Sequence, residues 1–175
     1  DWWGSWDYSA LIDICDQLFI MGYDYHWSGS EFSGPISPLG GFFFDLEYTI
    51  YDYIEATGGN SGKLVLGLPY YGYDWPVIDD TIYSPTIGNA NSQTYSNIIS
   101  LMEIHNNNWD DFSHSNWISY YESEWRQCWY DDSLSLSIKY NFVINNDLGG
   151  IGIWALGYDN GRDELWGAIE DNFSN

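Results

Sequence analysis

Apolar residues along the chain switch repeatedly between a strand-like and a helix-like spacing. Residues 18–21 form an uninterrupted apolar run, typical of a strand buried on both faces of a parallel sheet. Similar runs occur at residues 63–68 and 151–155. The segments around them carry apolar residues every three to four positions, as an amphipathic helix does. The pattern predicts helix, strand, helix, strand, an interruption, then helix, strand and helix.

The four predicted helices carry their own boundary signals. Asp7 is a plausible N-cap of the first helix, and Asp132 or Ser133 of the third. Gly58 and Gly59 end the second helix, because glycine tolerates the backbone conformation that follows a last turn. The apolar positions that define the helical faces are Tyr8, Leu11, Ile12 and Cys15; Leu46, Ile50, Tyr53 and Ile54; Leu134, Ile138, Phe142 and Val143; and Leu165, Ala168, Ile169 and Phe173.

Residues 76–131 interrupt this rhythm and are rich in Asn, Ser and Asp. They contain one short helical candidate, NIISLMEIH, and the stretch NWISYYESEWRQCWY, which predicts a hairpin with its turn near Glu122 and Glu124. We expect a small α+β insertion, because no linker leads out and the helix–strand pattern resumes afterwards. A separate domain is the weaker alternative. The expected units are therefore residues 1–75, residues 76–131 and residues 132–175.

Polar aromatic residues gather where each apolar strand should end. The first strand is followed by YDYHW, residues 23–27, and the second by PYYGYDW, residues 69–75. The third ends near Trp154, with Tyr158 and Asp159 just beyond. In barrels of alternating strands and helices, chemistry lies at the C-terminal strand ends. These residues could equally cap the edge of a core, but their repetition favours a site.

Alternation of this kind predicts a parallel sheet with right-handed crossovers. Three strand–helix units do not close a barrel, which needs eight. The fold is therefore either a small open sheet or part of something longer.

Composition favours a neutral ligand over an anionic one. Twenty-six acidic residues and four basic ones give a formal net charge of −22, which makes nucleic acid and anionic membranes poor partners. Eleven Trp and sixteen Tyr exceed what packing requires, and flat rings that stack on sugar faces explain part of the excess. The alternative is a core and surface that are simply rich in Tyr and Trp. The acidity otherwise serves solubility.

No cofactor or metal ligand set is visible in the sequence. The three His are far apart, and the chain has no CxxC. Cys15 and Cys128 allow at most one internal disulfide, and Cys15 fits better as a small buried hydrophobic residue. No apolar run reaches membrane-spanning length and no signal peptide opens the chain. We expect a mature or truncated soluble protein.

Three motifs, MGYDYHW, LGLPYYGYDW and GGIGIWALGYD, together resemble the last three strands of a family-18 glycoside hydrolase. They appear in order across nearly the whole chain. The resemblance implies an α/β fold that is the C-terminal portion of a (β/α)8 TIM barrel, with the α+β insertion after the seventh strand. The ending Tyr73, Asp74 and Trp75 is similar to the branch of spore-germination and peptidoglycan glucosaminidases.

The resemblance also implies residue roles. Such enzymes cleave β-1,4-linked N-acetylglucosamine glycans of the chitin or peptidoglycan type, retaining configuration through the acetamido group of the substrate. Tyr23 would hold that acetamido group, and Asp24 would contact the sugar and the neighbouring acid. Met21 would line the pocket and Trp154 would form its floor. Candidates for outer subsites are Tyr71 and Trp75.

One departure from the family pattern limits these expectations. The motif D-x-x-D-x-D-x-E, which supplies the general acid Glu, is not in this chain. We therefore expect the 175 residues alone to be inactive, with the N-terminal half of the same barrel as a partner besides the polysaccharide. The alternatives are a non-catalytic chitinase-like carbohydrate-binding protein and a purely structural role. A secreted, extracellular or cell-envelope location fits such substrates.

Two other polar residues have ordinary explanations. His26 is expected to pack and to form hydrogen bonds rather than to catalyse. Asp159, followed by Asn160 and Gly161, is expected first to form a turn and a helix cap.

Overall fold

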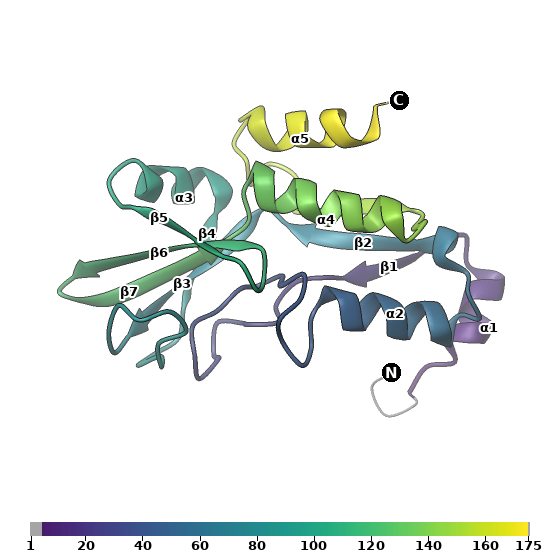
Figure 1. The fold of residues 1–175 in the computed structure, drawn as a ribbon, viewed down its shortest axis with the longest axis horizontal. Helices are drawn as coiled ribbons and strands as arrows, with labels where there is room; N and C mark the ends of the chain where they lie inside the picture. Colours follow the sequence, from purple (N-terminus) through teal and green to yellow (C-terminus); the bar gives the residue numbers. More distant parts are fainter. Residues whose placement is uncertain (1–4, 175) are drawn as a thin grey trace.

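The computed structural model describes residues 5–174, which form two β-sheets and the helices around them (Figure 1). The elements are, in chain order, α1 (Tyr8–Ile14), β1 (Leu18–Met21), α2 (Leu46–Ala56), the 3-10 turn η1 (Ser61–Lys63), β2 (Leu64–Pro69), β3 (Tyr71–Val77), β4 (Asn91–Thr94), α3 (Tyr95–Met102), β5 (Asn107–Asp110), β6 (Ser115–Glu122), β7 (Glu124–Tyr130), α4 (Ser133–Asn145), β8 (Gly150–Trp154) and α5 (Glu164–Phe173).

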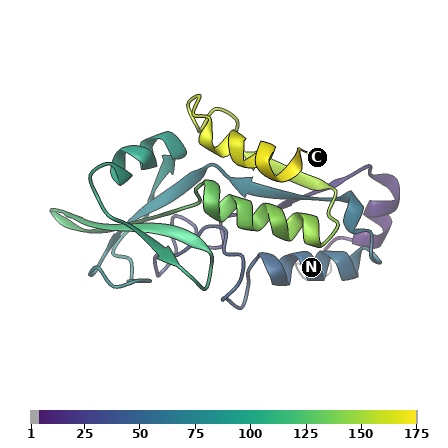
Figure 2. The same ribbon diagram turned by 45° about the horizontal axis from the view of Figure 1, so that its top comes forward.

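Three of the strands form the parallel sheet that the alternating pattern predicts. Its order is β1-β2-β8, with Phe19 opposite Val65 and Leu66 opposite Ile151. The helices α2, α4 and α5 lie along this sheet, and the antiparallel sheet extends from the far end (Figures 1 and 2). All four predicted helices are present, and Asp7 and Asp132 both accept hydrogen bonds from the first turns of their helices. An α/β partial barrel with an antiparallel sheet is the result.

The main core lies between the parallel sheet and the helices. Leu64, Leu66 and Leu68 point to this side from β2 because successive strand residues alternate between faces. They pack with Leu46 and Ile50 of α2 and with residues of α4 and α5. This burial is the main source of stability for the half of the molecule that contains the parallel sheet.

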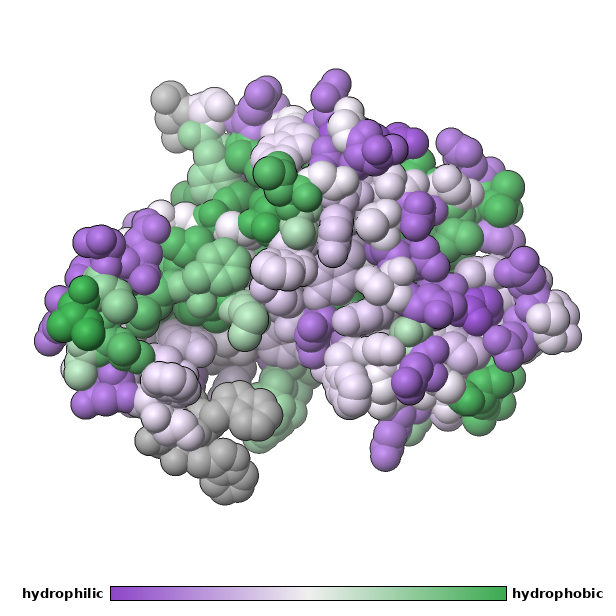
Figure 3. Space-filling view, turned by 180° about the vertical axis from the view of Figure 1, so that it is seen from behind, coloured by the Kyte–Doolittle hydropathy of each residue, from purple (hydrophilic) through white to green (hydrophobic). Residues whose placement is uncertain are grey.

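The opposite face of the parallel sheet is open, so the expectation that residues 18–21 are buried on both faces is wrong. Ile20 is buried, but Phe19 is 51% and Met21 68% exposed. The Phe19 ring lies across the sheet, where a Cβ on Gly67 or Gly152 would approach it to 2.4 or 2.2 Å. Figure 3 shows hydrophobic side chains gathered on this side of the molecule. No described strand or helix covers this face, which is the physical reason for the exposure.

The antiparallel sheet has the order β4-β3-β7-β6-β5 and carries α3 on one side. Its β6–β7 hairpin pairs Glu122 with Glu124, as the sequence predicts. The sheet begins at Tyr71, earlier than the boundary expected at residue 76. The aromatic stretch after β2 is therefore not a loop but the first strand of this sheet.

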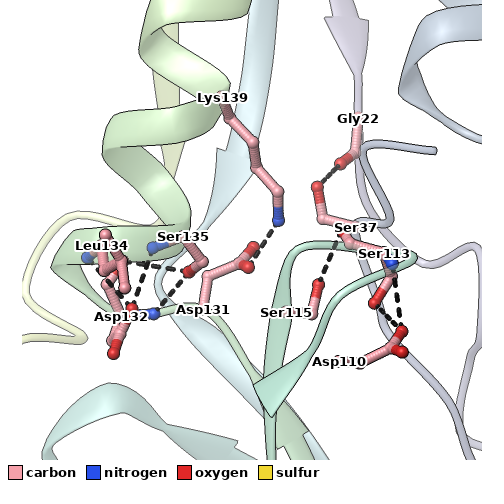
Figure 4. A network of polar contacts seen from close by, with 10 residues as sticks. All are labelled: Gly22, Ser37, Asp110, Ser113, Ser115, Asp131, Asp132, Leu134, Ser135 and Lys139. Atoms are coloured by element: carbon pink, nitrogen blue, oxygen red, sulfur yellow. Dashed lines mark hydrogen bonds and ion pairs between the residues drawn. The ribbon is translucent and has the colours of Figure 1, made fainter.

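A buried ion pair joins the end of β7 to α4. Lys139 donates a 2.5 Å hydrogen bond to Asp131 Oδ1, and both side chains are almost completely buried (Figure 4). Ser37, which donates to the carbonyl oxygen of Gly22, comes from a different segment of the chain in the same view. Ser37 therefore fixes the end of β1, and the ion pair fixes the start of α4.

The two cysteines are both free thiols; Cys128 is buried and Cys15 half-buried. No helix in residues 5–174 is long and apolar enough to cross a membrane.

Candidate functional site

A pocket of about 280 Å³ opens at the C-terminal ends of β1 and β8. Its lining is largely aromatic and comes from both sheets. The lining residues are Met21, Tyr23, Asp24, Tyr71, Tyr73, Ser92, Trp154 and Tyr158. The pocket therefore lies at the strand ends where the sequence predicts a site.

Tyr23 and Asp24 enter the pocket from the turn that follows β1. The backbone stays bound to the sheet as far as Gly22, whose N–H donates to the carbonyl oxygen of Gly67 at 2.9 Å. Asp24 then adopts a left-handed conformation with φ 62°, which Asp tolerates better than most residues. This turn directs the carboxylate of Asp24 toward β3. Tyr71 of β3 donates a 2.6 Å hydrogen bond to Oδ1 of Asp24.

The tyrosines around Asp24 hold their protons more tightly than usual. Burial, a hydrogen bond to Asp24 and its charge together raise the pKa of Tyr71 far above 10.0. The same causes raise the pKa of Tyr73 to about 12. The pKa of Tyr23 is raised by burial and by the charge of Asp24. All three hydroxyls therefore stay protonated at neutral pH and can donate hydrogen bonds. Asp24 is the acidic residue among those that line the pocket.

Trp154, the last residue of β8, forms one wall of the pocket. Its side chain is 53% exposed, and its ring lies 6.3 Å from that of Tyr23 at an angle of 31°. The peptide bond between Trp154 and Ala155 is cis. The carbonyl oxygen of Trp154 accepts a hydrogen bond from the backbone N–H of Tyr70, which ties the end of β8 to the start of the antiparallel sheet. A half-exposed indole held in this way offers an apolar surface to a ligand.

Five of the six residues expected at the site line the pocket together: Met21, Tyr23, Asp24, Tyr71 and Trp154. Tyr71 does not have the expected place in an outer subsite, because the residue is only 6% exposed and its hydroxyl is bound to Asp24.

Trp75 does not line the pocket, and its expected role as an outer subsite is wrong. Its side chain is 0% exposed and belongs to a buried cluster with Ile36, Val77 and Trp129. Trp75 shares a face of β3 with Tyr71 and Tyr73, and Tyr71 belongs to the same cluster, but Trp75 is not among the residues that line the pocket. A covered indole cannot stack on a sugar.

Three lining residues were not assigned to the site individually, although two of them, Tyr73 and Tyr158, belong to the polar aromatic strand ends. Tyr73 lies two positions from Tyr71 on the same strand face, so strand alternation could have identified it. Tyr158 follows the third strand, at the same strand-end position as the other candidates. Ser92 reaches the pocket because β4 pairs with β3, which places it opposite Tyr73. Nothing in its Asn- and Ser-rich surroundings distinguishes it.

His26 has the packing and hydrogen-bonding contacts that the sequence suggested. Asp159 forms the expected turn but does not cap the next helix, because the N-cap of α5 is Asp163. The His26 Nδ1 atom lies 2.8 Å from the carbonyl oxygen of Pro35, its ring contacts Phe42, and burial lowers its pKa. Asp159 accepts hydrogen bonds from Gly161 N and Trp166 Nε1. Within residues 5–174, no three His, Cys, Asp or Glu side chains are grouped to hold a metal ion.

The arrangement suits a neutral ligand that has both apolar faces and hydrogen-bonding groups. Trp154 and Met21 offer exposed apolar surface, while Tyr23 has a hydroxyl for which the described residues provide no hydrogen-bond partner. Asp24 can accept hydrogen bonds or stabilise a nearby positive charge. The pocket by itself lacks a second carboxyl group that could act as a proton donor to a leaving group.

Comparison with known proteins identifies one family. The model of the family described as Glycosyl hydrolases family 18 matches residues 1–159. The cortical fragment-lytic enzyme of Bacillus subtilis (strain 168) is 27% identical over 182 aligned positions, covering 99% of this chain and 38% of that enzyme.

Solved structures share the fold. The GH18 chitinase from Cycas revoluta, solved in complex with (GlcNAc)3, aligns with a TM-score of 0.87 at 23% identity. The chitinase-like agglutinin from Robinia pseudoacacia aligns with a TM-score of 0.81 at 24% identity. In both cases the alignment covers 97% of this chain and 50% of the other. The chain thus spans about half the length of these relatives.

Proposed function

Because the chain belongs to family 18 of the glycosyl hydrolases, we propose that it is part of a glycosidase that cleaves β-1,4-linked N-acetylglucosamine glycans. The glycans would be of the chitin or peptidoglycan type. The observation that carries the proposal is the joining of Tyr23, Asp24 and Trp154 in one pocket at the ends of β1 and β8.

The proposed chemistry is substrate-assisted hydrolysis with retention of configuration. The acetamido oxygen of the substrate attacks the anomeric carbon, while a general acid protonates the leaving glycosidic oxygen. Water then opens the resulting oxazolinium ion. The hydroxyl of Tyr23 would donate a hydrogen bond to the acetamido oxygen and orient it for attack, which can lower the barrier because the geometry is set in advance.

Asp24 and Trp154 would complete the substrate site from this chain. Asp24 would stabilise the positive charge that develops on the acetamido group and the sugar ring. Trp154 would lie beneath the apolar face of the sugar, with Met21 beside it. The general acid would come from a D-x-x-D-x-D-x-E motif, and no such motif occurs in these 175 residues.

The open face of the parallel sheet supports a second half of the same barrel as the partner. Among residues 5–174, β1 and β8 each pair with one strand, so each leaves a row of backbone hydrogen-bonding groups for another strand. Phe19 and Met21 project from that face with half or more of their surface exposed. Further parallel strands would cover these side chains and bring a proton donor toward Trp154.

We propose a secreted or cell-envelope location, because chitin and peptidoglycan are polymers outside the cytoplasm. The alternative function is that of a non-catalytic, chitinase-like carbohydrate-binding protein. The fold shared with a chitinase-like agglutinin supports this alternative.

Two measurements test the proposal and separate it from the alternative. The 175-residue chain should bind N-acetylglucosamine oligomers, detected as a change in intrinsic Trp fluorescence, without hydrolysing them. A longer chain that carries an intact acid motif before residue 1 should hydrolyse a fluorogenic oligomer. Binding without hydrolysis by the longer chain would favour the carbohydrate-binding alternative. If the longer chain showed neither binding nor hydrolysis, both functions would be disproved.

A further inference from the structure

A group of exposed aromatic rings lies outside the pocket, at the start of α2. It comprises Phe43, Phe44, Tyr48 and Tyr51, and we call it the α2 aromatic patch. These side chains are 81%, 59%, 49% and 56% exposed. Exposed aromatic clusters of this kind are uncommon on soluble proteins and often mark binding surfaces. None of these four side chains has a role in the proposed glycosidase reaction, because none lines the pocket.

The rings of the α2 aromatic patch pack against one another and against α4. Phe43 and Phe44 contact each other with ring centres 4.7 Å apart, and both contact Tyr48. Tyr51 packs edge-on against Phe142 of α4. Asp45 fixes the turn beneath them, because its carboxylate accepts hydrogen bonds from the N–H groups of Phe42 and Tyr48.

The charge next to the patch is negative. Glu47 is exposed in the first turn of α2, and on a helix it shares a face with Tyr51. The four Lys and Arg residues of the chain are engaged elsewhere. Lys63 donates to the carbonyl oxygens of Ile12 and Cys15, and Arg126 pairs with Asp74 and Glu124. Lys139 pairs with Asp131, and Arg162 pairs with Glu164.

Rings and a carboxylate that no described Lys or Arg side chain engages select for a ligand that combines an apolar face with positive charge. An ammonium group is attracted both to the face of an aromatic ring and to a carboxylate. The net charge of −22 adds a long-range attraction for a cationic polymer. The same charge opposes the association of two copies of this chain through the patch.

We propose that the α2 aromatic patch is a surface site, separate from the pocket, for amino sugars that carry a free ammonium group. Such sugars occur wherever an N-acetylglucosamine glycan has lost acetyl groups. The proposal rests on the proposed function for its choice of a glycan. A glucosamine unit presents an apolar C–H face to a ring and an ammonium group to Glu47, whereas an N-acetylated unit presents only the face.

The test compares hexamers of glucosamine and of N-acetylglucosamine by calorimetric titration of the 175-residue chain. The glucosamine hexamer should bind more tightly, and raising the salt from about 20 mM to about 300 mM should weaken its binding about tenfold. Replacing both rings, Phe43→Ser with Phe44→Ser, should weaken its binding about fivefold. The same double change should leave binding of the acetylated hexamer unaltered, because that sugar binds in the pocket.

Matched variants separate the site from general surface charge. Glu47→Gln and Glu170→Gln each remove one exposed negative charge, but Glu47 lies in α2 between Phe44 and Tyr48 in sequence, whereas Glu170 lies in α5. Ile104→Ser removes an exposed apolar side chain far from it in sequence. Only the changes at Phe43, Phe44 and Glu47 should weaken binding of the glucosamine hexamer.

Three results would overturn the proposal. They are unchanged binding after loss of both Phe rings, equal effects of Glu47→Gln and Glu170→Gln, and binding of a lysine hexamer as tight as that of the glucosamine hexamer. The last would identify a basic protein as the partner. Failure of the acetylated hexamer to bind would instead count against the proposed function, because that hexamer probes the pocket alone.

Discussion

The hydroxyl of Tyr71 donates a hydrogen bond of 2.6 Å to Oδ1 of Asp24. This contact connects β3, the first strand of the antiparallel sheet, to the turn that follows β1 of the parallel sheet. Tyr73 also interacts with the Asp24 carboxylate. The orientation of the acidic residue in the pocket therefore depends on side chains from the other sheet.

Replacing Tyr71 with Phe should weaken the binding of N-acetylglucosamine oligomers. The change removes a hydrogen bond to a charged group, worth about 1.5–3 kcal/mol, while keeping the buried ring. We expect affinity to fall about tenfold, measured by Trp fluorescence. The control is Tyr121→Phe, because Tyr121 is 64% exposed and outside the pocket. Unchanged affinity in Tyr71→Phe would show that Asp24 needs no such support.

Tyr23 and Tyr25 should respond differently to loss of their hydroxyls. The Tyr25 hydroxyl donates to Thr49 at 2.6 Å and approaches the carbonyl oxygen of Asp45, so Tyr25→Phe should lower the unfolding free energy by about 1–2 kcal/mol. Tyr23→Phe should leave stability nearly unchanged but weaken oligomer binding. Denaturant unfolding and fluorescence titration of both variants provide the comparison. A stability loss in Tyr23→Phe equal to that in Tyr25→Phe would contradict a ligand-binding role.

Two tryptophans offer a similar contrast. Trp154 is 53% exposed in the pocket, whereas Trp75 is 0% exposed in the core of the antiparallel sheet. Trp154→Ala should abolish most oligomer binding with little loss of stability. Trp75→Ala should cost about 3–5 kcal/mol of unfolding free energy, because it leaves a large cavity. If Trp75→Ala unfolded at the same denaturant concentration as the wild type, its burial would be in doubt.

The difference between these two tryptophans also marks the limit of prediction from the sequence. Tyr71, Tyr73 and Trp75 alternate regularly, so the pattern shows that they share a face of one strand. Trp75 is buried in a cluster that includes Ile36 and Trp129, which lie far away in the sequence, whereas Tyr73 is only partly buried against it. Local spacing contains no information about those contacts.

The same argument applies to the parallel sheet. Alternating apolar runs predict its three strands, and the parallel pairing predicts that Tyr23 and Trp154 meet at one edge. The exposure of Phe19 and Met21 could not be predicted, because an apolar strand looks the same whether one or both of its faces are covered. The number of neighbouring elements decides this, and it is a property of the whole fold.

The pocket tyrosines should make the protein less stable at alkaline pH. An unfolded tyrosine ionises near its ordinary pKa of 10.0, whereas Tyr73 in the folded chain ionises at about 12 and Tyr71 higher still. Above pH 10.0 the unfolded state therefore loses protons that the folded state keeps, and stability falls as the pH rises. Denaturant unfolding across this range should show a smaller decline in Tyr71→Phe than in the wild type. An identical decline in both proteins would contradict the raised pKa of Tyr71.

Replacing one member of the buried pair Lys139–Asp131 should lower the unfolding free energy strongly, whereas replacing both should lower it little. Their side chains are 0% and 1% exposed, and Asp131 Oδ2 has no hydrogen-bond partner among the described residues. Lys139→Met would leave a buried carboxylate without a cation, and we expect a loss of about 3–5 kcal/mol in unfolding free energy. Combining it with Asp131→Leu should restore most of that loss, because no uncompensated charge then remains.

A surface pair provides the control for this cycle. Arg162 and Glu164 lie 3.2 Å apart with side chains 39% and 37% exposed, so Arg162→Met should change the unfolding free energy by less than about 1 kcal/mol. The cycle is measured by urea unfolding of the two single variants, the double variant and the wild type. A double variant as unstable as Lys139→Met would show that Asp131 holds the β7–α4 junction together by hydrogen bonds rather than by its charge.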